Sequence, residues 1–164
     1  MKPIQKRFNR LFPYILIGLG LFGCSEERPD GLPKLQPVSL QFTQDGLPCS
    51  EASVHLVPQD ESPWAVGGST DTTGTVIFKT HGKFTGVPAG KYKVTVSKVE
   101  REEVGPKPQN MYESQEIVMY DLIDQIYSDP KMTPLEIDVL SGKKLSESFD
   151  LGKKIRVKIV KPGN

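Results

Sequence analysis

The stretch GVPAGKYKVTV, residues 86–96, decides the fold class. Tyr92, Val94 and Val96 are apolar residues spaced two apart, with polar residues between them, and this period is that of a strand with one buried face. Residues 88–90, PAG, are typical of a tight turn. The stretch therefore predicts a half-buried β-strand that follows a turn and places Tyr92, Val94 and Val96 on one core face.

The same alternation recurs along the rest of the chain. Its apolar residues are Val38, Leu40 and Phe42; Val54 and Leu56; Val76 and Phe78; Leu135, Ile137 and Val139; and Ile155, Val157 and Ile159. Sequences rich in Gly, Asp and Pro separate the runs, as turns do. We therefore expect a mainly β domain, a single antiparallel β-sandwich with about seven strands.

One segment breaks the alternation. In SQEIVMYDLIDQIY, residues 114–127, apolar residues recur at helical spacing, with Ser114 as a candidate N-cap and a Pro shortly after the segment. The residues at this spacing are Met119, Leu122, Ile123, Ile126 and Tyr127. The pattern predicts one short amphipathic helix inserted in the domain and packed on the sandwich.

The N-terminal end has the layout of a secretory signal peptide. Basic residues precede an apolar segment of about 12 residues, 11–22, which is shorter than the roughly 20 residues that a helix needs to cross a bilayer. The segment ends in Leu-Phe-Gly-Cys, residues 21–24, which resembles the lipobox of bacterial lipoproteins. The resemblance implies that residues 1–23 are removed, that the Cys24 thiol carries a diacylglycerol, and that the new amine carries a further acyl chain such as palmitate. The alternative is an ordinary signal with a chance cysteine.

This resemblance also implies a location in the bacterial cell envelope, with the domain in the periplasm or at the cell surface. Ser25 follows the cysteine, rather than the Asp that retains lipoproteins in the inner membrane of some bacteria, which favours the outer membrane. Residues 24–37 are polar and rich in Pro and Gly, and this composition predicts a flexible tether ahead of a domain at 38–164.

The charge balance argues against nucleic acid as a partner. Residues 1–23 carry four of the 21 basic residues and none of the 20 acidic ones, so the remaining chain has 17 against 20. A mildly acidic chain without a basic patch interleaved with aromatic residues lacks the electrostatic footprint of a nucleic-acid-binding protein.

Three motifs occur in the order found in one known domain family. They are QDGLPCSEASVHLVPQD at 44–60, GGSTDTTGTVIF at 67–78 and GVPAGKYKVTV at 86–96. Together they resemble the carboxypeptidase regulatory-like, transthyretin-like β-sandwich domain. The lipobox in front and IYSDPKMTPLEIDV at 126–139 are similar to the small lipoproteins of this class that are abundant in planctomycete bacteria.

The sequence offers no catalytic set. His55 and His81 are the two histidines of the chain, too few for a zinc site with three or four ligands. No nucleophile accompanied by a base and no pair of acids in a recognisable frame is present. Cys49 is expected to be a small buried residue beside a turn, the alternative being a reactive thiol. We therefore expect no enzyme activity, no metal and no cofactor.

Two loops are candidates for contact with a partner. Trp64 lies in the loop at 59–66, either as an exposed platform for sugar stacking or as a lid over the core, and Tyr112 lies in the Pro-rich segment 104–112. The expected function is that of a non-catalytic, membrane-anchored envelope lipoprotein whose sandwich binds an envelope protein or glycan or has a structural role. The alternative is an accessory subunit or domain of an envelope enzyme such as a peptidase.

Overall fold

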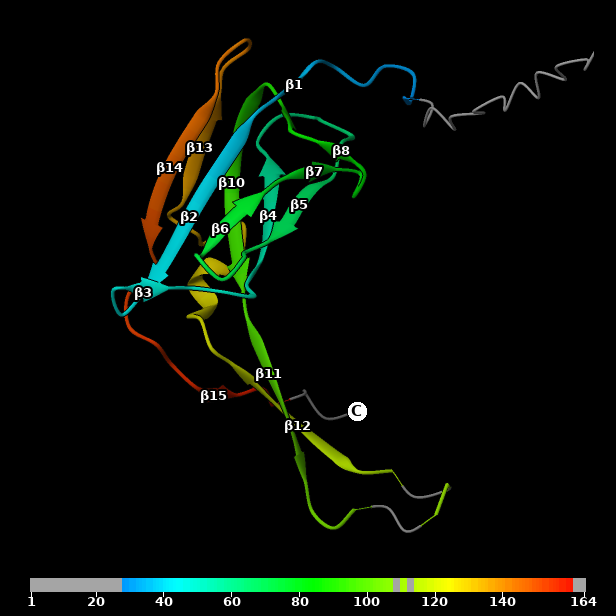
Figure 1. Ribbon diagram of the computed structural model, residues 1–164, viewed down its shortest axis with the longest axis vertical. Coiled ribbons are helices and arrows are strands. Elements are labelled where there is room, and N and C mark those ends of the chain that lie inside the picture. The colour runs from blue at the N-terminus through cyan, green and yellow to red at the C-terminus, as the bar shows by residue number, and fades with distance from the viewer. Residues whose placement is uncertain (1–27, 108–109, 112–113, 161–164) are drawn as a thin grey trace, which may run out of the picture. The chain divides into compact units, whose positions relative to one another are not determined.

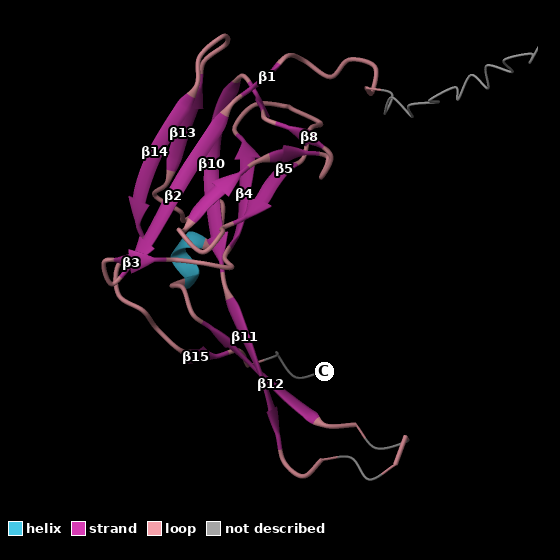
Figure 2. Cartoon of the chain, in the orientation of Figure 1, coloured by secondary structure: helices cyan, strands magenta, loops and turns pink. Residues whose placement is uncertain are grey.

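The computed structural model of the protein describes residues 28–107, 110–111 and 114–160. The described chain is mainly β, with fifteen strands and one short 3-10 helix (Figures 1 and 2). Every one of these elements lies in residues 31–164, which form one compact unit.

The largest sheet has six strands in the order β13-β10-β4-β5-β7-β8, and all its neighbours are antiparallel. Its strands are β4 (Ser53–Pro58), β5 (Val66–Ser69), β7 (Lys79–Thr80), β8 (Phe84–Thr85), β10 (Gly90–Ser97) and β13 (Glu136–Val139). The stretch at 86–96 provides β10, which pairs with β4 on one side and β13 on the other.

The second sheet has the order β14-β2-β3, with β6 also paired to β2. Its strands are β2 (Val38–Gln44), β3 (Leu47–Pro48), β6 (Thr75–Ile77) and β14 (Leu145–Asp150). Here β14 runs parallel to β2, so the prediction of a purely antiparallel arrangement is wrong. The reason is that residues 140–144 carry the chain from β13 in the large sheet directly to the edge of this one, where β14 is aligned with β2.

Both sheets contribute buried side chains to one hydrophobic cluster, and Figure 1 shows β2 and β14 in one layer and β4 and β10 in another. The predicted core faces are confirmed for the strands around this cluster. Fully buried members include Leu40, Phe42, Val54, Val76, Phe78, Val94 and Val139. Cys49 is buried beside the β2–β3 turn and belongs to the same cluster, as predicted.

Two smaller sheets complete the described chain. In one, β1 (Leu35–Gln36) pairs with β9 (Val87–Pro88), so two residues of the predicted tether are held in a strand. In the other, β12 (Glu116–Asp121) lies between β11 (Val99–Val104) and β15 (Val157–Lys158). We call this three-stranded sheet the ribbon.

The helix predicted at 114–127 is absent. Residues 116–121 form strand β12, and the helical part is a single 3-10 turn, η1 (Gln125–Tyr127), which Asp124 caps by accepting a hydrogen bond from the Ile126 N–H at 3.0 Å. Ile117, Val118 and Tyr120 are residue types that favour strands, and the pairing with β11 satisfies their backbone groups in the extended form. The strand predicted from Ile155, Val157 and Ile159 is also shorter than expected, because only Val157 and Lys158 are in a strand there.

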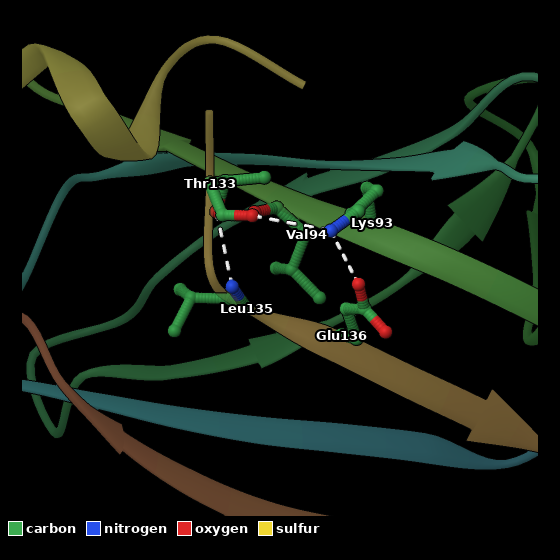
Figure 3. Close-up of polar contacts among 5 residues, drawn as sticks. All are labelled: Lys93, Val94, Thr133, Leu135 and Glu136. Atoms are coloured by element: carbon green, nitrogen blue, oxygen red, sulfur yellow. Dashed lines mark hydrogen bonds and ion pairs between the residues drawn. The ribbon is translucent and has the colours of Figure 1, made fainter. Parts of the chain in front are cut away.

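Polar contacts fasten the segment before β13 to the central strand β10 (Figure 3). The Thr133 hydroxyl donates to the Val94 carbonyl at 2.8 Å and accepts from the Leu135 N–H at 3.3 Å. The Lys93 ammonium forms an ion pair with Glu136 and donates to the Thr133 carbonyl. The ion pair lowers the pKa of Glu136, because its carboxylate accepts a hydrogen bond from the Lys93 ammonium.

The DTTG turn before β6 is organised by Asp71. Its carboxylate accepts hydrogen bonds from the Thr73 hydroxyl at 2.6 Å and from the Thr73 and Thr75 N–H groups at 2.8 and 3.0 Å. The bond from the Thr73 hydroxyl, followed by those from the backbone, lowers the pKa of Asp71. Gly74 completes the turn with φ +75°, the left-handed conformation that glycine adopts without steric cost.

Candidate binding groove

A groove of about 610 Å³ lies on the outer face of the large sheet, over β4, β5 and β7. The residues that line it include His55, Ala65, Gly67, Ser69, Lys79 and His81. Its volume is in the range of small-molecule and oligosaccharide sites, which are typically 300–1,000 Å³. The groove is therefore large enough for a ligand of that size, and it is open to solvent along the sheet surface.

Gly67 forms part of the groove floor. In the register of β4 and β5, Gly67 lies opposite His55, and a Cβ at position 67 would come within 2.8 Å of the His55 Nδ1. Because Gly67 has no side chain, the His55 ring can lie close over the backbone of β5 at this residue. The groove continues beside the ring, where no side chain of Gly67 projects. The next residue, Gly68, faces the opposite side, where a Cβ would meet the Val76 side chain in the core.

Trp64 stands beside the groove through its contact with His81, which lines it. The two rings meet edge to face, with centroids 5.1 Å apart and planes at 81°. His81 has φ +52°, and its N–H donates to the Ala65 carbonyl at 2.8 Å, so the backbone fixes it close to the Trp64 loop. Trp64 is half-buried and does not belong to the hydrophobic cluster of the core. Of the two readings from sequence, this position disfavours a lid over the core.

The groove combines hydrogen-bonding groups with apolar surface. Ser53, Ser69, Lys79 and the two histidines supply donors and acceptors, and no acidic residue is among those that line it. These groups can bind hydroxyl or anionic groups of a ligand, while the Trp64 ring can pack against its carbon skeleton. The described part of the chain holds no group of three or more His, Cys, Asp or Glu side chains placed to bind a metal ion.

The other candidates from sequence are distributed as follows. Cys24 and Tyr112 lie outside the described residues. His55 is exposed in mid-strand, between the buried residues Val54 and Leu56. Burial raises the pKa of the Cys49 thiol, which keeps it protonated at neutral pH and weakens it as a nucleophile.

Sequence reasoning did not identify the groove, although Trp64 and both histidines had been considered. Gly67, Ser69 and Lys79 come together only through the register of β4, β5 and β7. One signal was present in the sequence, because two consecutive glycines at the start of a strand often mark a place where a ligand or another chain segment approaches the backbone closely.

Comparison of the chain with models of protein families, with curated proteins and with solved structures gave no match. Among the described residues, no helix has both the length and the apolar character required to span a membrane.

Proposed function

We propose that the protein is a non-catalytic, lipid-anchored protein of the bacterial envelope whose β-sandwich binds a glycan in the groove beside Trp64. The observation that carries this proposal is the groove itself, with its glycine floor, polar lining and adjacent indole. A glycan suits it better than a protein surface because sugars present both hydroxyl groups and an apolar carbon face in a narrow outline. Pockets for small ligands combine apolar contact with a few placed polar groups in this way.

The proposed fold type is a sandwich of the carboxypeptidase regulatory-like, transthyretin-like class. The shared cluster between the two main sheets supports it. Further support comes from Tyr92, whose hydroxyl donates to the Pro88 carbonyl at 2.9 Å, four residues upstream. A buried tyrosine that bonds back to the chain before its own strand, called a tyrosine corner, recurs in immunoglobulin-like sandwiches.

The anchor is proposed to be lipid on Cys24, held in the outer membrane, with residues 25–34 joining it to the first strand. Two or more acyl chains bind a bilayer stably, whereas one chain binds only marginally. Such an anchor would keep the groove within reach of envelope glycans.

Replacing Cys24 with alanine is expected to abolish lipidation and to leave an uncleaved precursor. The reason is that the thiol is the attachment point and the cut follows modification in lipoproteins of this type. Intact-mass spectrometry of the chain from membranes would show the added lipid on the wild type and none on the variant. An unmodified cysteine in the wild type would contradict the anchor.

Glycan binding is expected to change the fluorescence of Trp64, the sole tryptophan of the chain. Residues 28–164 would be titrated with neutral and uronic-acid oligosaccharides of the envelope. Trp64→Ala should weaken binding at least about fivefold, since a stacked aromatic ring contributes about 1 kcal/mol beyond its buried area. Gly67→Val should weaken it as well by filling the floor with a residue that strands accept.

Calorimetry would measure both variants, because Trp64→Ala removes the fluorophore. Leu47→Ala is the matched control, since Leu47 is 68% exposed on β3 in the other sheet. Binding that is unaffected by both groove variants would exclude the groove as the site. Turnover of a glycan, ester or peptide by the purified domain would overturn the non-catalytic assignment.

A further inference from the structure

One row of residues crosses the groove on neighbouring strands of the large sheet (Figure 1). His55 on β4 lies opposite Gly67 on β5, and Gly67 lies opposite Lys79 on β7. Residues that lie opposite one another point to the same face of a sheet, so all three belong to the outer face. Because neighbouring strands are about 4.8 Å apart, the Cα atoms of His55 and Lys79 are about 10 Å apart. Two nitrogen-bearing side chains therefore flank the glycine.

The His55 ring extends from β4 over β5, in the direction of β7. Its Nδ1 and Cε1 atoms are the ring atoms nearest to Gly67, at 2.8 and 3.4 Å from the place that a Cβ would occupy there. Within the described residues the ring nitrogens form no hydrogen bond. They are therefore available to a ligand that lies across the row.

The groove carries a positive charge that no residue of its lining neutralises. Lys79 is exposed, and it takes part in none of the ion pairs found among the described residues. Its cross-strand neighbours are Gly67 on one side and Thr85 on the other, and both are uncharged. Asp60 and Glu61, the acids of the loop that carries Trp64, do not line the groove.

Two other lysines on the same face of this sheet have acidic neighbours. Lys91 on β10 lies opposite Asp138 on β13, and Lys93 lies opposite Glu136, with which it forms an ion pair. Opposite charges placed across neighbouring strands stabilise a sheet. Lys79 has no such partner, so its charge is left for a ligand in the groove.

We infer that the groove binds glycans that carry a carboxylate in preference to neutral glycans, and that Lys79 is the residue that binds the carboxylate. This inference rests on the proposed glycan-binding function and names the ligand class of that site. The Lys79 ammonium pairs with the negative charge and donates to a carboxylate oxygen, while the His55 ring forms a hydrogen bond from the other side of the row.

The carboxylate site and the stacking site lie close enough for one glycan to use both. Ala65, which follows Trp64, is two residues from Gly67, or about 7 Å along the chain. The sugar that stacks on Trp64 and the carboxylate at Lys79 therefore belong to the same sugar or to adjacent ones. A carboxylate fits better than a phosphate, because phosphates are typically held by arginine or by a helix N-terminus, and neither lines the groove.

The test is calorimetric titration of residues 28–164, a segment that contains all fifteen strands and the whole core. The probes are trisaccharides of galacturonic, glucuronic and mannuronic acid, each paired with its methyl ester, which keeps the sugar skeleton and removes the charge. We expect one acid at least to bind about fivefold more tightly than its ester, which corresponds to an ion pair of about 1 kcal/mol. Raising the salt from about 0.05 M to about 0.5 M should reduce this difference, because salt screens exposed charges.

Lys79→Gln should weaken the binding of the acidic trisaccharide about fivefold and leave that of its ester unchanged. A merely structural role of Lys79 would affect both ligands alike. Lys91→Gln is the matched control, since Lys91 is exposed on the same face of the same sheet, outside the groove. It makes the same change of charge and should leave both affinities unchanged. Circular dichroism would verify that each variant keeps its strands.

Three results would overturn the inference. Equal affinities for each acid and its ester would exclude a preference for the carboxylate and leave glycan binding in the groove standing. A Lys79→Gln variant that binds the acid as the wild type does, or that loses acid and ester equally, would exclude Lys79 as the carboxylate site. Displacement of the trisaccharide by acetate at the same carboxylate concentration would show a site for simple anions and not for acidic glycans.

Discussion

Replacing Gly74 with alanine is expected to lower the free energy of unfolding by roughly 3 kcal/mol. Part of the loss is conformational, because φ at Gly74 is +75° and a Cβ in the left-handed region costs about 1–2 kcal/mol. The rest is steric, since a Cβ there would overlap the Phe42 carbonyl oxygen and come within 3.1 Å of the Cys49 N–H nitrogen. Both obstacles are backbone atoms, so no side chain can move aside.

Movement of the backbone would also disturb the hydrogen bonds at this point. The Phe42 N–H donates to the Gly74 carbonyl at 2.8 Å, and the Phe42 carbonyl accepts from the Cys49 N–H at 2.9 Å. The first bond joins the DTTG turn to β2, and the second joins β2 to Cys49, the residue after β3. We therefore expect that the variant either keeps the overlap as strain or gives up part of this junction, with a melting temperature lower by on the order of 10 °C.

Gly46→Ala separates the two causes. Gly46 has φ +73°, nearly the same conformation, but a Cβ there would meet no atom within 4 Å. The free energy of unfolding of Gly46→Ala should therefore fall only by the conformational part, about 1–2 kcal/mol. Chemical denaturation of residues 28–164 carrying each change would give both values. Equal losses for the two variants would show that the close approach of Phe42 contributes nothing.

The sequence predicted the core strands well because period-two alternation is a direct consequence of burying one face of a sheet. Tyr92, Val94 and Val96 are 2%, 0% and 1% exposed, as the stretch at 86–96 predicted. Strands β2, β4, β6 and β13, which surround the cluster, follow the same rule. In these segments local pattern and tertiary packing favour the same structure.

Strands β11 and β12 of the ribbon were missed because their structure depends on long-range pairing. The β11 sequence VEREEV has four charged residues and no alternation, so no local pattern indicates a strand. Residues 114–127 fit helical spacing, yet β12 forms because β11 supplies six paired residues along its length. Strand β14 was missed for a similar reason, since Glu147 interrupts its alternation and its partner is β2, more than 100 residues earlier.

The groove was predictable only in part. Trp64 was selected as a loop aromatic, but its contact with His81 depends on the left-handed turn at His81 and on the pairing of β5 with β7. A single sequence gives strand positions along the chain and not the register between strands, which is what brings His55 opposite Gly67. Binding surfaces that run across strands are therefore harder to predict than cores.

Val94→Asp is expected to cost at least about 4 kcal/mol, the largest loss of any single change considered for this chain. Val94 is 0% exposed at the centre of β10. Both of its backbone groups are already hydrogen-bonded. Its N–H donates to the Leu135 carbonyl at 2.9 Å, and its carbonyl accepts from the Thr133 hydroxyl at 2.8 Å (Figure 3). A carboxylate there would find no backbone donor left free by Val94 itself and would be buried among apolar side chains.

Two control variants separate the effect of burying a charge at position 94 from the loss of side-chain volume and from the introduction of an aspartate elsewhere in the chain. Val94→Ala should cost less, about 2 kcal/mol, because it removes two methyl groups and buries no charge. Ile77→Asp should cost little, since Ile77 is 65% exposed on β6. Burial raises the pKa of a carboxyl group, so relative to wild type the Val94→Asp loss should grow as pH rises above the ordinary value of about 4 and level off above the raised pKa. A loss that equals that of Val94→Ala and does not vary with pH would show that position 94 reaches water and that β10 is not the centre of the core.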